Sequence, residues 1–269
     1  MTLSNARRRE LTALTSRHQR RKRPDVLLLE GPLLIEALLR QPASAWQLQY
    51  VVVADDATGD PAIVQLLQLA AGAGVPVESV AADELATWCS TVTPQGALAV
   101  AAPDGPAPTL ASVAAPTTPA PRIRLLVLDG VQDPGNVGTL IRSAAAFGAG
   151  AVCLCAGCAD LSNPRVLRAS MGGAFALPVL SRVDRDELAD ALEAAALPLV
   201  VADIGGEPYT SFAWPADGCA LALGAEVAGA SSVLRARAGQ VVGIPQRAEP
   251  QSINVAMAGS ILLAFAATL

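Results

Sequence analysis

Residues 124–155 read RLLVLDGVQDPGNVGTLIRSAAAFGAGAVCLC, and this stretch decides the class of fold. The unbroken apolar run over 125–128 is typical of a strand that is buried on both faces. A polar turn with Pro134 and Gly135 follows, then a helical stretch opening at Asn136, and a second apolar run begins at Ala151. Strand, helix and strand in this order predict a parallel βαβ unit.

The same alternation continues to the end of the chain. Further strand-like runs are LPVL, PLVVADI, CALALGA and QVVGIPQ, and the helical stretches between and after them open at Pro164, Asp184 and Ser252. We therefore predict an α/β domain over 122–269 whose parallel sheet is covered by helices on both faces. Ligands of such sheets bind beyond the carboxyl ends of the strands.

Three loops at the expected strand ends place polar side chains among small residues. They are DPGNVGTLIRSAAAFG from Asp133, LGAEVAG from Leu223 and IPQRAEPQSINVAMA from Ile244. Singly, each polar residue has an ordinary explanation, since Asn136 and Ser252 suit helix caps and Glu226 suits a surface. Three such loops at neighbouring strand ends are a much rarer coincidence, which favours one shared pocket.

Arg142 stands in the helical stretch of the first loop, six residues after Asn136, among Val, Leu, Ile and Ala. At 100° per residue the two side chains lie on different helical faces, so they would work together only through the geometry of the loops. Arg142 could pair with an acidic neighbour. However, a guanidinium in an apolar stretch is costly to bury without a partner, which favours a functional role.

Residues 1–102 predict a second, smaller α/β domain. LLLEGPLLIEALLR from Leu27 indicates a strand, a Gly31-Pro32 turn and a helix, and WQLQYVVVAD, VPVESV and ALAVAAP supply further strands. Between Pro103 and Pro121 there are six prolines and almost no periodic pattern. We interpret 103–121 as a semi-rigid linker between the domains.

The net charge of −5 conceals a basic amino-terminal arm. Within the first 23 residues, Glu10 is accompanied by eight cations, namely Arg7, Arg8, Arg9, Arg17, Arg20, Arg21, Lys22 and Arg23. Clustered Arg neutralises phosphates and releases their counterions, so this arm predicts a nucleic-acid partner, the alternative being a frayed, solvated terminus. The single histidine, His18, lies in the arm, which leaves Ser-His-Asp and Cys-His hydrolases without support.

Composition sets the remaining bounds. The 269 residues are 52% apolar, ample for packed cores, and the five cysteines favour a reducing cytoplasm over a secreted disulfide framework. Cys153, Cys155 and Cys158 could be metal ligands, but the first two alternate with apolar residues on a strand and fit buried hydrophobes better. No secretory signal opens the sequence, and 250–269 predicts a buried helix and no membrane span.

Taken together, the three loops resemble those of the SpoU (TrmH) branch of the SPOUT superfamily, RNA ribose 2′-O-methyltransferases that use S-adenosylmethionine. The resemblance extends from Ile123 to the carboxyl end. LLLEGPLLIEALL resembles, more loosely, the family's ribosomal-protein-L30e-like substrate-binding domain. The resemblance implies a trefoil-knotted α/β domain that forms a homodimer, and 252–268 is the candidate helix for its interface.

The resemblance also implies roles for individual residues. The implied catalytic residues are Asn136, Arg142, Glu226, Ser252 and Asn254, and the implied cofactor contacts are Ala202, Leu223, Gly224, Ile244 and Ile253. Arg142 would activate the ribose hydroxyl, and Glu226 would anchor Arg142 or a neighbouring loop. Two departures stand out: Val227 replaces the family's usual Gly, and QRAEPQ at 246–251 lacks the usual Met and Gly.

The resulting hypothesis is S-adenosylmethionine-dependent 2′-O-methylation of structured RNA, with 23S ribosomal RNA as the first expected target and transfer RNA as the second. The alternative is a catalytically inactive RNA-binding or ribosome-assembly protein that retains the knotted fold. A dinucleotide-dependent enzyme would need a G-x-G-x-x-G turn from a strand into a helix. It is excluded because Gly148-Ala149-Gly150 precedes a strand and lacks the third glycine.

Overall fold

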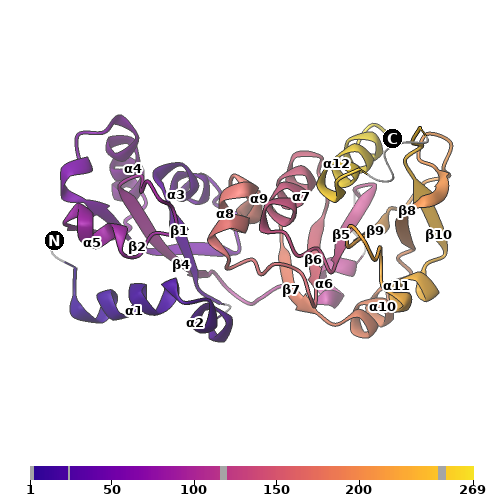
Figure 1. The fold of residues 1–269 in the computed structure, drawn as a ribbon, viewed down its shortest axis with the longest axis horizontal. Helices are drawn as coiled ribbons and strands as arrows, with labels where there is room; N and C mark the ends of the chain where they lie inside the picture. Colours follow the sequence, from indigo (N-terminus) through magenta and orange to yellow (C-terminus); the bar gives the residue numbers. More distant parts are fainter. Residues whose placement is uncertain (1–2, 24, 116–119, 248–252) are drawn as a thin grey trace. The chain divides into compact units, whose positions relative to one another are not determined.

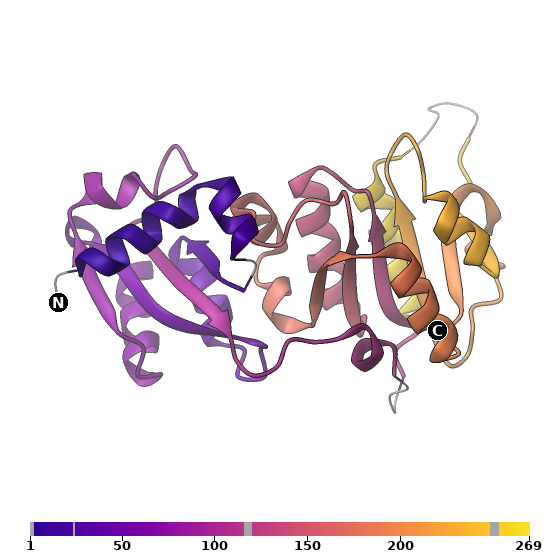
Figure 2. The ribbon, with the colours of Figure 1, turned by 90° about the horizontal axis from the view of Figure 1, so that it is seen from below.

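The structure, a computed structural model, describes residues 3–23, 25–115, 120–247 and 253–269. Its contacts divide the chain into two compact units (Figures 1 and 2). The first comprises Met1–Ala107 and Ser162–Ala176, and the second comprises Pro108–Leu161 and Leu177–Leu269. The segment Ser162–Ala176 therefore packs with the first unit, although the sequence pattern assigns it to the domain at 122–269.

The first unit is built on a four-stranded sheet in the order β1-β4-β2-β3. Its strands are β1 (Leu27–Glu30), β2 (Trp46–Ala54), β3 (Val77–Val80) and β4 (Ala97–Pro103). Its helices are α1 (Asn5–Thr15), α2 (Arg17–Lys22), α3 (Pro32–Leu39), η1 (Asp55–Ala57), α4 (Pro61–Gly72), α5 (Ala82–Ala86), α8 (Pro164–Ser170) and α9 (Gly173–Ala176). β4 is antiparallel to both of its neighbours, whereas β2 and β3 are parallel. The four strands and the helix after Gly31-Pro32 that the sequence predicts are all present.

The amino-terminal arm is folded, so its interpretation as a frayed terminus is wrong. Ser4 caps α1 by accepting a hydrogen bond from the backbone N–H of Arg7 at 3.3 Å. Leu11 and Leu14 on the inner face of α1 are fully buried in the core of the first unit. Burial of these leucines fixes the helix against the sheet, because each buried side chain contributes about 1.5–3 kcal/mol of hydrophobic free energy.

The second unit contains a six-stranded sheet in which every pairing is parallel, in the order β10-β8-β9-β5-β6-β7. Its strands are β5 (Ile123–Asp129), β6 (Ala151–Cys155), β7 (Val179–Val183), β8 (Leu199–Pro208), β9 (Cys219–Gly224) and β10 (Gln240–Gly243). Its helices are α6 (Leu110–Ala114), α7 (Pro134–Ala146), α10 (Arg185–Ala194), α11 (Ser232–Arg237) and α12 (Val255–Ala266). Helix α6 lies within the predicted linker at 103–121, which is therefore partly structured.

Helices cover both faces of this sheet, as the unbroken apolar strands predict (Figure 1). Helices α6, α10 and α11 pack on one face in a shared apolar core, and α7 and α12 lie side by side on the other. Gly259 allows α12 to approach closely, because a Cβ there would lie 2.3 Å from Leu140 Cδ2 and 2.5 Å from Leu223 Cδ1.

Two helices begin at residues other than those predicted. Helix α7 begins at Pro134, and Asp133 caps it by accepting from the Asn136 N–H at 2.8 Å, so Asn136 is not the cap. The fixed φ of proline suits the first helical position. Helix α12 begins at Val255, and Asn254 is its cap. Ser252, the predicted cap, lies outside the described residues.

The cysteines on β6 are buried side chains of the sheet. Cys153 and Cys155 are about 1% exposed or less, and burial, followed by the nearby charge of Asp129, raises the pKa of the Cys155 thiol to about 12. A thiol of such pKa stays protonated at neutral pH, which suits a small hydrophobe. Among the described residues, no helix has the length and apolar character needed to cross a membrane. The trefoil knot stays a prediction.

Candidate functional site

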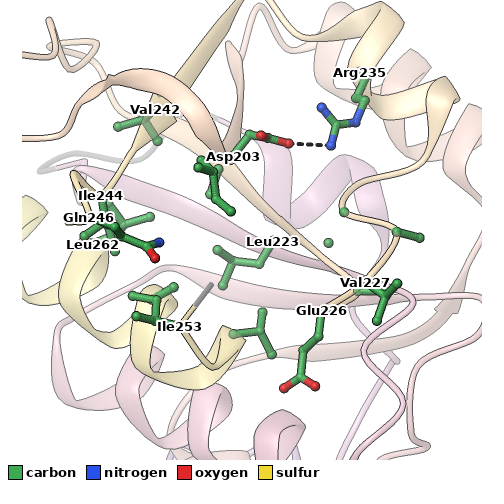
Figure 3. A pocket seen from close by; sticks show the side chains of 18 residues that line it. Asp203, Leu223, Glu226, Val227, Arg235, Val242, Ile244, Gln246, Ile253 and Leu262 are labelled. Atoms are coloured by element: carbon green, nitrogen blue, oxygen red, sulfur yellow. Dashed lines mark hydrogen bonds and ion pairs between the residues drawn. The ribbon is translucent and has the colours of Figure 1, made fainter. Parts of the chain in front are cut away.

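A cavity of about 250 Å³ opens at the carboxyl ends of β9 and β10 and beside residues 202–204 within β8, at the edge where the sequence predicts a pocket (Figure 3). All five of the residues expected to contact a cofactor line it: Ala202, Leu223, Gly224, Ile244 and Ile253. These residues come from two strands and from the two ends of the segment between β10 and α12. Figure 3 shows Ile244, Gln246 and Leu262 on one side of the cavity and Glu226 and Val227 on another.

A short loop over residues 225–230, called here the 225–230 loop, forms one wall. Ala225 and Gly229 exchange backbone hydrogen bonds of 3.1 and 2.8 Å, which closes the loop on itself. The closure needs glycine at position 224, because a Cβ there would lie 1.9 Å from the carbonyl carbon of Gly229. Val227 at the tip is fully exposed beside the mouth of the cavity. Glycine thus lets the loop fold back and brings backbone edges to the cavity wall.

Glu226 joins the three predicted loops through hydrogen bonds. Its Oε1 atom accepts from Asn136 Nδ2 at 2.8 Å and from Asn254 Nδ2 at 3.1 Å. Asn254 Nδ2 also donates to Asn136 Oδ1 at 3.1 Å. These three side chains, called here the polar trio, come from α7, the 225–230 loop and the start of α12. The structure therefore brings together three of the five expected catalytic residues.

Arg142 does not join the polar trio. It lies on the exposed face of α7 and does not line the cavity, and no hydrogen bond or ion pair of this side chain is found in the described part of the chain. Arg142 is therefore not the buried guanidinium that its apolar sequence neighbours led us to expect, because the buried residues of α7 are Val137, Leu140, Ile141 and their inner-face neighbours. The expectation that Glu226 anchors Arg142 is likewise not met within one copy. Glu226 anchors its neighbouring loops instead.

An ion pair in the cavity wall escaped the sequence analysis. Arg235 of α11 forms an ion pair with Asp203 of β8, and its Nε atom donates to the carbonyl of Ala230 at 2.9 Å (Figure 3). Burial opposes the charge on Asp203, but hydrogen bonds from Arg235 and the Gly205 N–H, with the Arg235 charge, hold the pKa of that carboxyl below its usual value. Asp203 ends the apolar run PLVVAD, and that position was the available signal.

In the basic arm, ion pairs within the first unit engage several of the cations. Arg7 pairs with Glu78 and lies 4.3 Å above the Tyr50 ring, a favourable cation–π distance. Arg8 pairs with Glu84. These two side chains therefore hold α1 against the sheet, and their charge is already compensated.

The other arm residues fall into three groups. Arg23 pairs with Glu10 at 3.1 Å, and Arg20 Nη1 donates to the carbonyls of Leu14 and Thr15. Arg9 and Lys22 are exposed and form no ion pair with the residues that the structure describes. The side chains of Arg17 and Arg21 lie outside the described atoms.

Comparison with known proteins agrees with this architecture. Residues 124–264 match the model of the SpoU rRNA Methylase family, and residues 28–107 match that of the RNA 2′-O ribose methyltransferase substrate-binding domain. The chain is 30% identical over 244 residues to the 23S rRNA (guanosine(2553)-2′-O)-methyltransferase RlmP of Bacillus subtilis, covering 90% of this chain and 89% of the relative.

Two solved structures resemble this chain over almost its whole length. The AdoMet-bound rRNA methyltransferase from Sinorhizobium meliloti has a TM-score of 0.81 and 26% identity, and covers 99% of this chain and 96% of its own. The SpoU methyltransferase AviRb from Streptomyces viridochromogenes, in complex with AdoMet, has a TM-score of 0.82 and 26% identity, with 98% of each chain covered. Loops, sheet order and family models agree, and the chain belongs to the SpoU rRNA Methylase family, whose members are RNA methyltransferases that use S-adenosylmethionine.

Proposed function

We propose that this protein methylates a ribose 2′-hydroxyl in structured RNA, with 23S ribosomal RNA as the first target to test and transfer RNA as the second. One observation carries the proposal: the three loops meet in the polar trio beside the cavity. The RlmP likeness supports the ribosomal target, since that relative is a 23S rRNA 2′-O-methyltransferase. Discrimination between RNAs belongs to the first unit, because ribose chemistry is the same for every base.

The cavity suits S-adenosylmethionine, which supplies an activated methyl group on a sulfonium. Ile244, Ile253 and Leu262 offer an apolar wall for a planar adenine ring. Glu226 offers a carboxylate at the cavity wall, and a negative charge there favours a positively charged ligand. Gly224 lets a ligand lie against backbone atoms. The residues present therefore fit this cofactor.

The chain's own residues have distinct tasks in this proposal. Asn136 and Asn254 hold the loops around the substrate hydroxyl through Glu226. Arg142 orients the ribose and stabilises the developing alkoxide, a task for a fixed cation. A guanidinium holds its proton too tightly to act as an efficient base at neutral pH. The further task expected of Ser252, contact with the substrate, remains a proposal from the resemblance.

We also propose that the second unit forms a homodimer through α12. Met257 and Ile261 on the outer face of this helix are 62% and 37% exposed, an arrangement that favours burial by a second copy. Arg142 is exposed on the adjacent helix α7, so the dimer would give it a route to a partner's cavity.

The direct test is methyl transfer from labelled S-adenosylmethionine to 23S ribosomal RNA and to bulk transfer RNA, both taken from a strain lacking the gene. The expected result is one labelled ribose in ribosomal RNA, located by mapping 2′-O-methylation. Calorimetric titration with S-adenosylmethionine runs in parallel. Absence of both binding and transfer would overturn the proposal in favour of a non-catalytic RNA-binding protein.

A further inference from the structure

Asp129, the last residue of β5, is a buried carboxylate that lies outside the cavity wall. It is only 2% exposed, and it is not among the residues that line the cavity. An ionised carboxylate is costly to bury unless hydrogen bonds and an opposite charge compensate it. The partners of Asp129 therefore indicate what this residue does.

Its two oxygens have different partners. Oδ1 accepts from Arg185 Nε at 2.7 Å, and Arg185 Nη2 lies 2.6 Å from the same oxygen. Arg185 is itself fixed, because its Nη2 also donates to the carbonyl of Ala156 at 2.8 Å. Oδ2 accepts from the backbone N–H of Ser231 at 2.7 Å. Arg185 thus compensates the negative charge of Asp129. The hydrogen bond to Oδ2 fixes the position of the Ser231 N–H.

Asp129 holds both ends of the 225–230 loop. On one side, Asp129 pairs with Gly224 in the parallel register of β5 and β9, directly before the loop. On the other side, its carboxylate binds the N–H of Ser231, directly after the loop and at the cap of α11. Glu226 lies between these two fixed ends. Its position beside Asn136 and Asn254 therefore depends on the separation that Asp129 sets.

We infer that Asp129, braced by Arg185, is a positioning residue that fixes the 225–230 loop and through it Glu226. Its consequence for catalysis rests on the proposed function, whereas its consequence for the loop does not. In this role Asp129 differs from a carboxylate that merely stabilises the sheet. Removing the pairing between Asp129 and Arg185 should make the 225–230 loop more mobile and leave the remaining strands unaffected.

The test combines hydrogen exchange with binding and transfer in the full chain. Asp129→Asn retains an oxygen for the Ser231 N–H but weakens the pairing with Arg185, and Arg185→Gln removes the brace. Arg185→Gln also serves if Asp129→Asn does not fold, because its side chain is 27% exposed. Arg237→Gln is the matched control, since Arg237 pairs with the exposed Asp190 and Glu193.

We expect amide exchange within 225–231 to rise at least tenfold in both variants, with β6 and β7 unchanged, and neither effect in Arg237→Gln. Single-turnover methyl transfer should fall at least tenfold, more than the affinity for S-adenosylmethionine falls, because Glu226 is displaced while the apolar wall stays. The inference would be overturned if the amide exchange rate within 225–231 did not change, or if it rose equally across the whole sheet. If the wild-type chain transfers no methyl group, the proposed function fails and the exchange result still decides this inference.

Discussion

At the scale of single residues, the polar trio and Arg142 differ in how firmly their side chains are held. Glu226 is held by two amide groups from distant parts of the chain, so its orientation is fixed before any substrate binds. Arg142 has no such restraint among the described residues and projects from the exposed face of α7. We therefore expect substitutions at Glu226 and at Arg142 to have different effects on stability, cofactor binding and methyl transfer.

Arg142→Ala should abolish methyl transfer while leaving cofactor affinity nearly intact, because Arg142 does not line the cavity. Loss of a charge-stabilising group typically costs about 10²–10³ in rate. The measurements are single-turnover transfer and calorimetric titration with S-adenosylmethionine, with Arg237→Ala as an exposed control. Equal loss of transfer and binding would contradict this division of tasks.

Glu226→Gln should keep the fold and impair transfer. The glutamine carbonyl can still accept from Asn136 and Asn254, so the free energy of unfolding should change by no more than about 0.5 kcal/mol. The negative charge is lost, and we expect at least a tenfold slower transfer, equal to about 1.4 kcal/mol. Chemical denaturation and transfer assays check the two effects. A wild-type rate in this variant would show that the charge has no role.

At the scale of elements, the contact between α12 and the rest of the second unit depends on Gly259. Leu140 of α7 and Leu223 of β9 both occupy the space that a side chain would need. Leu223 also lines the cavity, so the packing of α12 and the shape of the cavity are coupled.

Gly259→Ala should destabilise the protein although alanine favours helices. Helix propensity would contribute about 1 kcal/mol, but overpacking a tight core costs about 1–3 kcal/mol. Displacement of Leu223 should also weaken binding of S-adenosylmethionine. Gly72→Ala in α4 is the matched control, because a Cβ there meets nothing within 4 Å. Equal stability changes in the two variants, measured by denaturation, would contradict the close-packing argument.

At the scale of the whole molecule, the basic arm and the proposed homodimer can each be tested by substitution. The arm contributes ion pairs that hold α1 in place, through Arg7, Arg8 and Arg23, as well as exposed cations. Among the arm side chains that the structure describes, Arg9 and Lys22 can meet phosphates without breaking an ion pair.

Arg9→Gln and Lys22→Gln should weaken RNA binding at low salt without changing stability. Each lost phosphate contact should reduce the slope of log K against log salt concentration by about one. Arg8→Gln is the contrasting variant, since it removes the pairing with Glu84, and it should lower stability slightly. Filter binding across a salt series measures the slopes. If the slopes of Arg9→Gln and Lys22→Gln equalled that of the wild type, these two residues would not contact the RNA phosphates.

The proposed dimer gives a complementation test. Light scattering of the purified chain should give twice the monomer mass, and Met257→Glu should shift it toward the monomer by burying a charge at the interface. If Arg142 serves a partner's cavity, mixing Arg142→Ala with Glu226→Ala should restore part of the transfer that each lacks alone. A monomeric wild-type chain would overturn the proposed homodimer. If mixing the variants restored no transfer, Arg142 would not act in the cavity of a partner.

The sequence by itself determined the parallel sheet, the first unit's strands and the three loops. These follow from short-range pattern: apolar runs mark strands, and the carboxyl ends of parallel strands share one edge of a sheet. The family resemblance added roles to loop residues whose spacing alone is ordinary.

Only the tertiary structure decided which distant residues meet. Glu226 and Asn136 are separated by 90 positions, Asp129 and Ser231 by 102, and Arg7 and Glu78 by 71. Likewise, the exposure of Arg142 and the packing of Ser162–Ala176 with the first unit depend on which surfaces cover which helices. Local sequence sets dihedral preferences and periodicity over a few residues, whereas a contact between distant side chains exists only once the core has packed and fixed their positions.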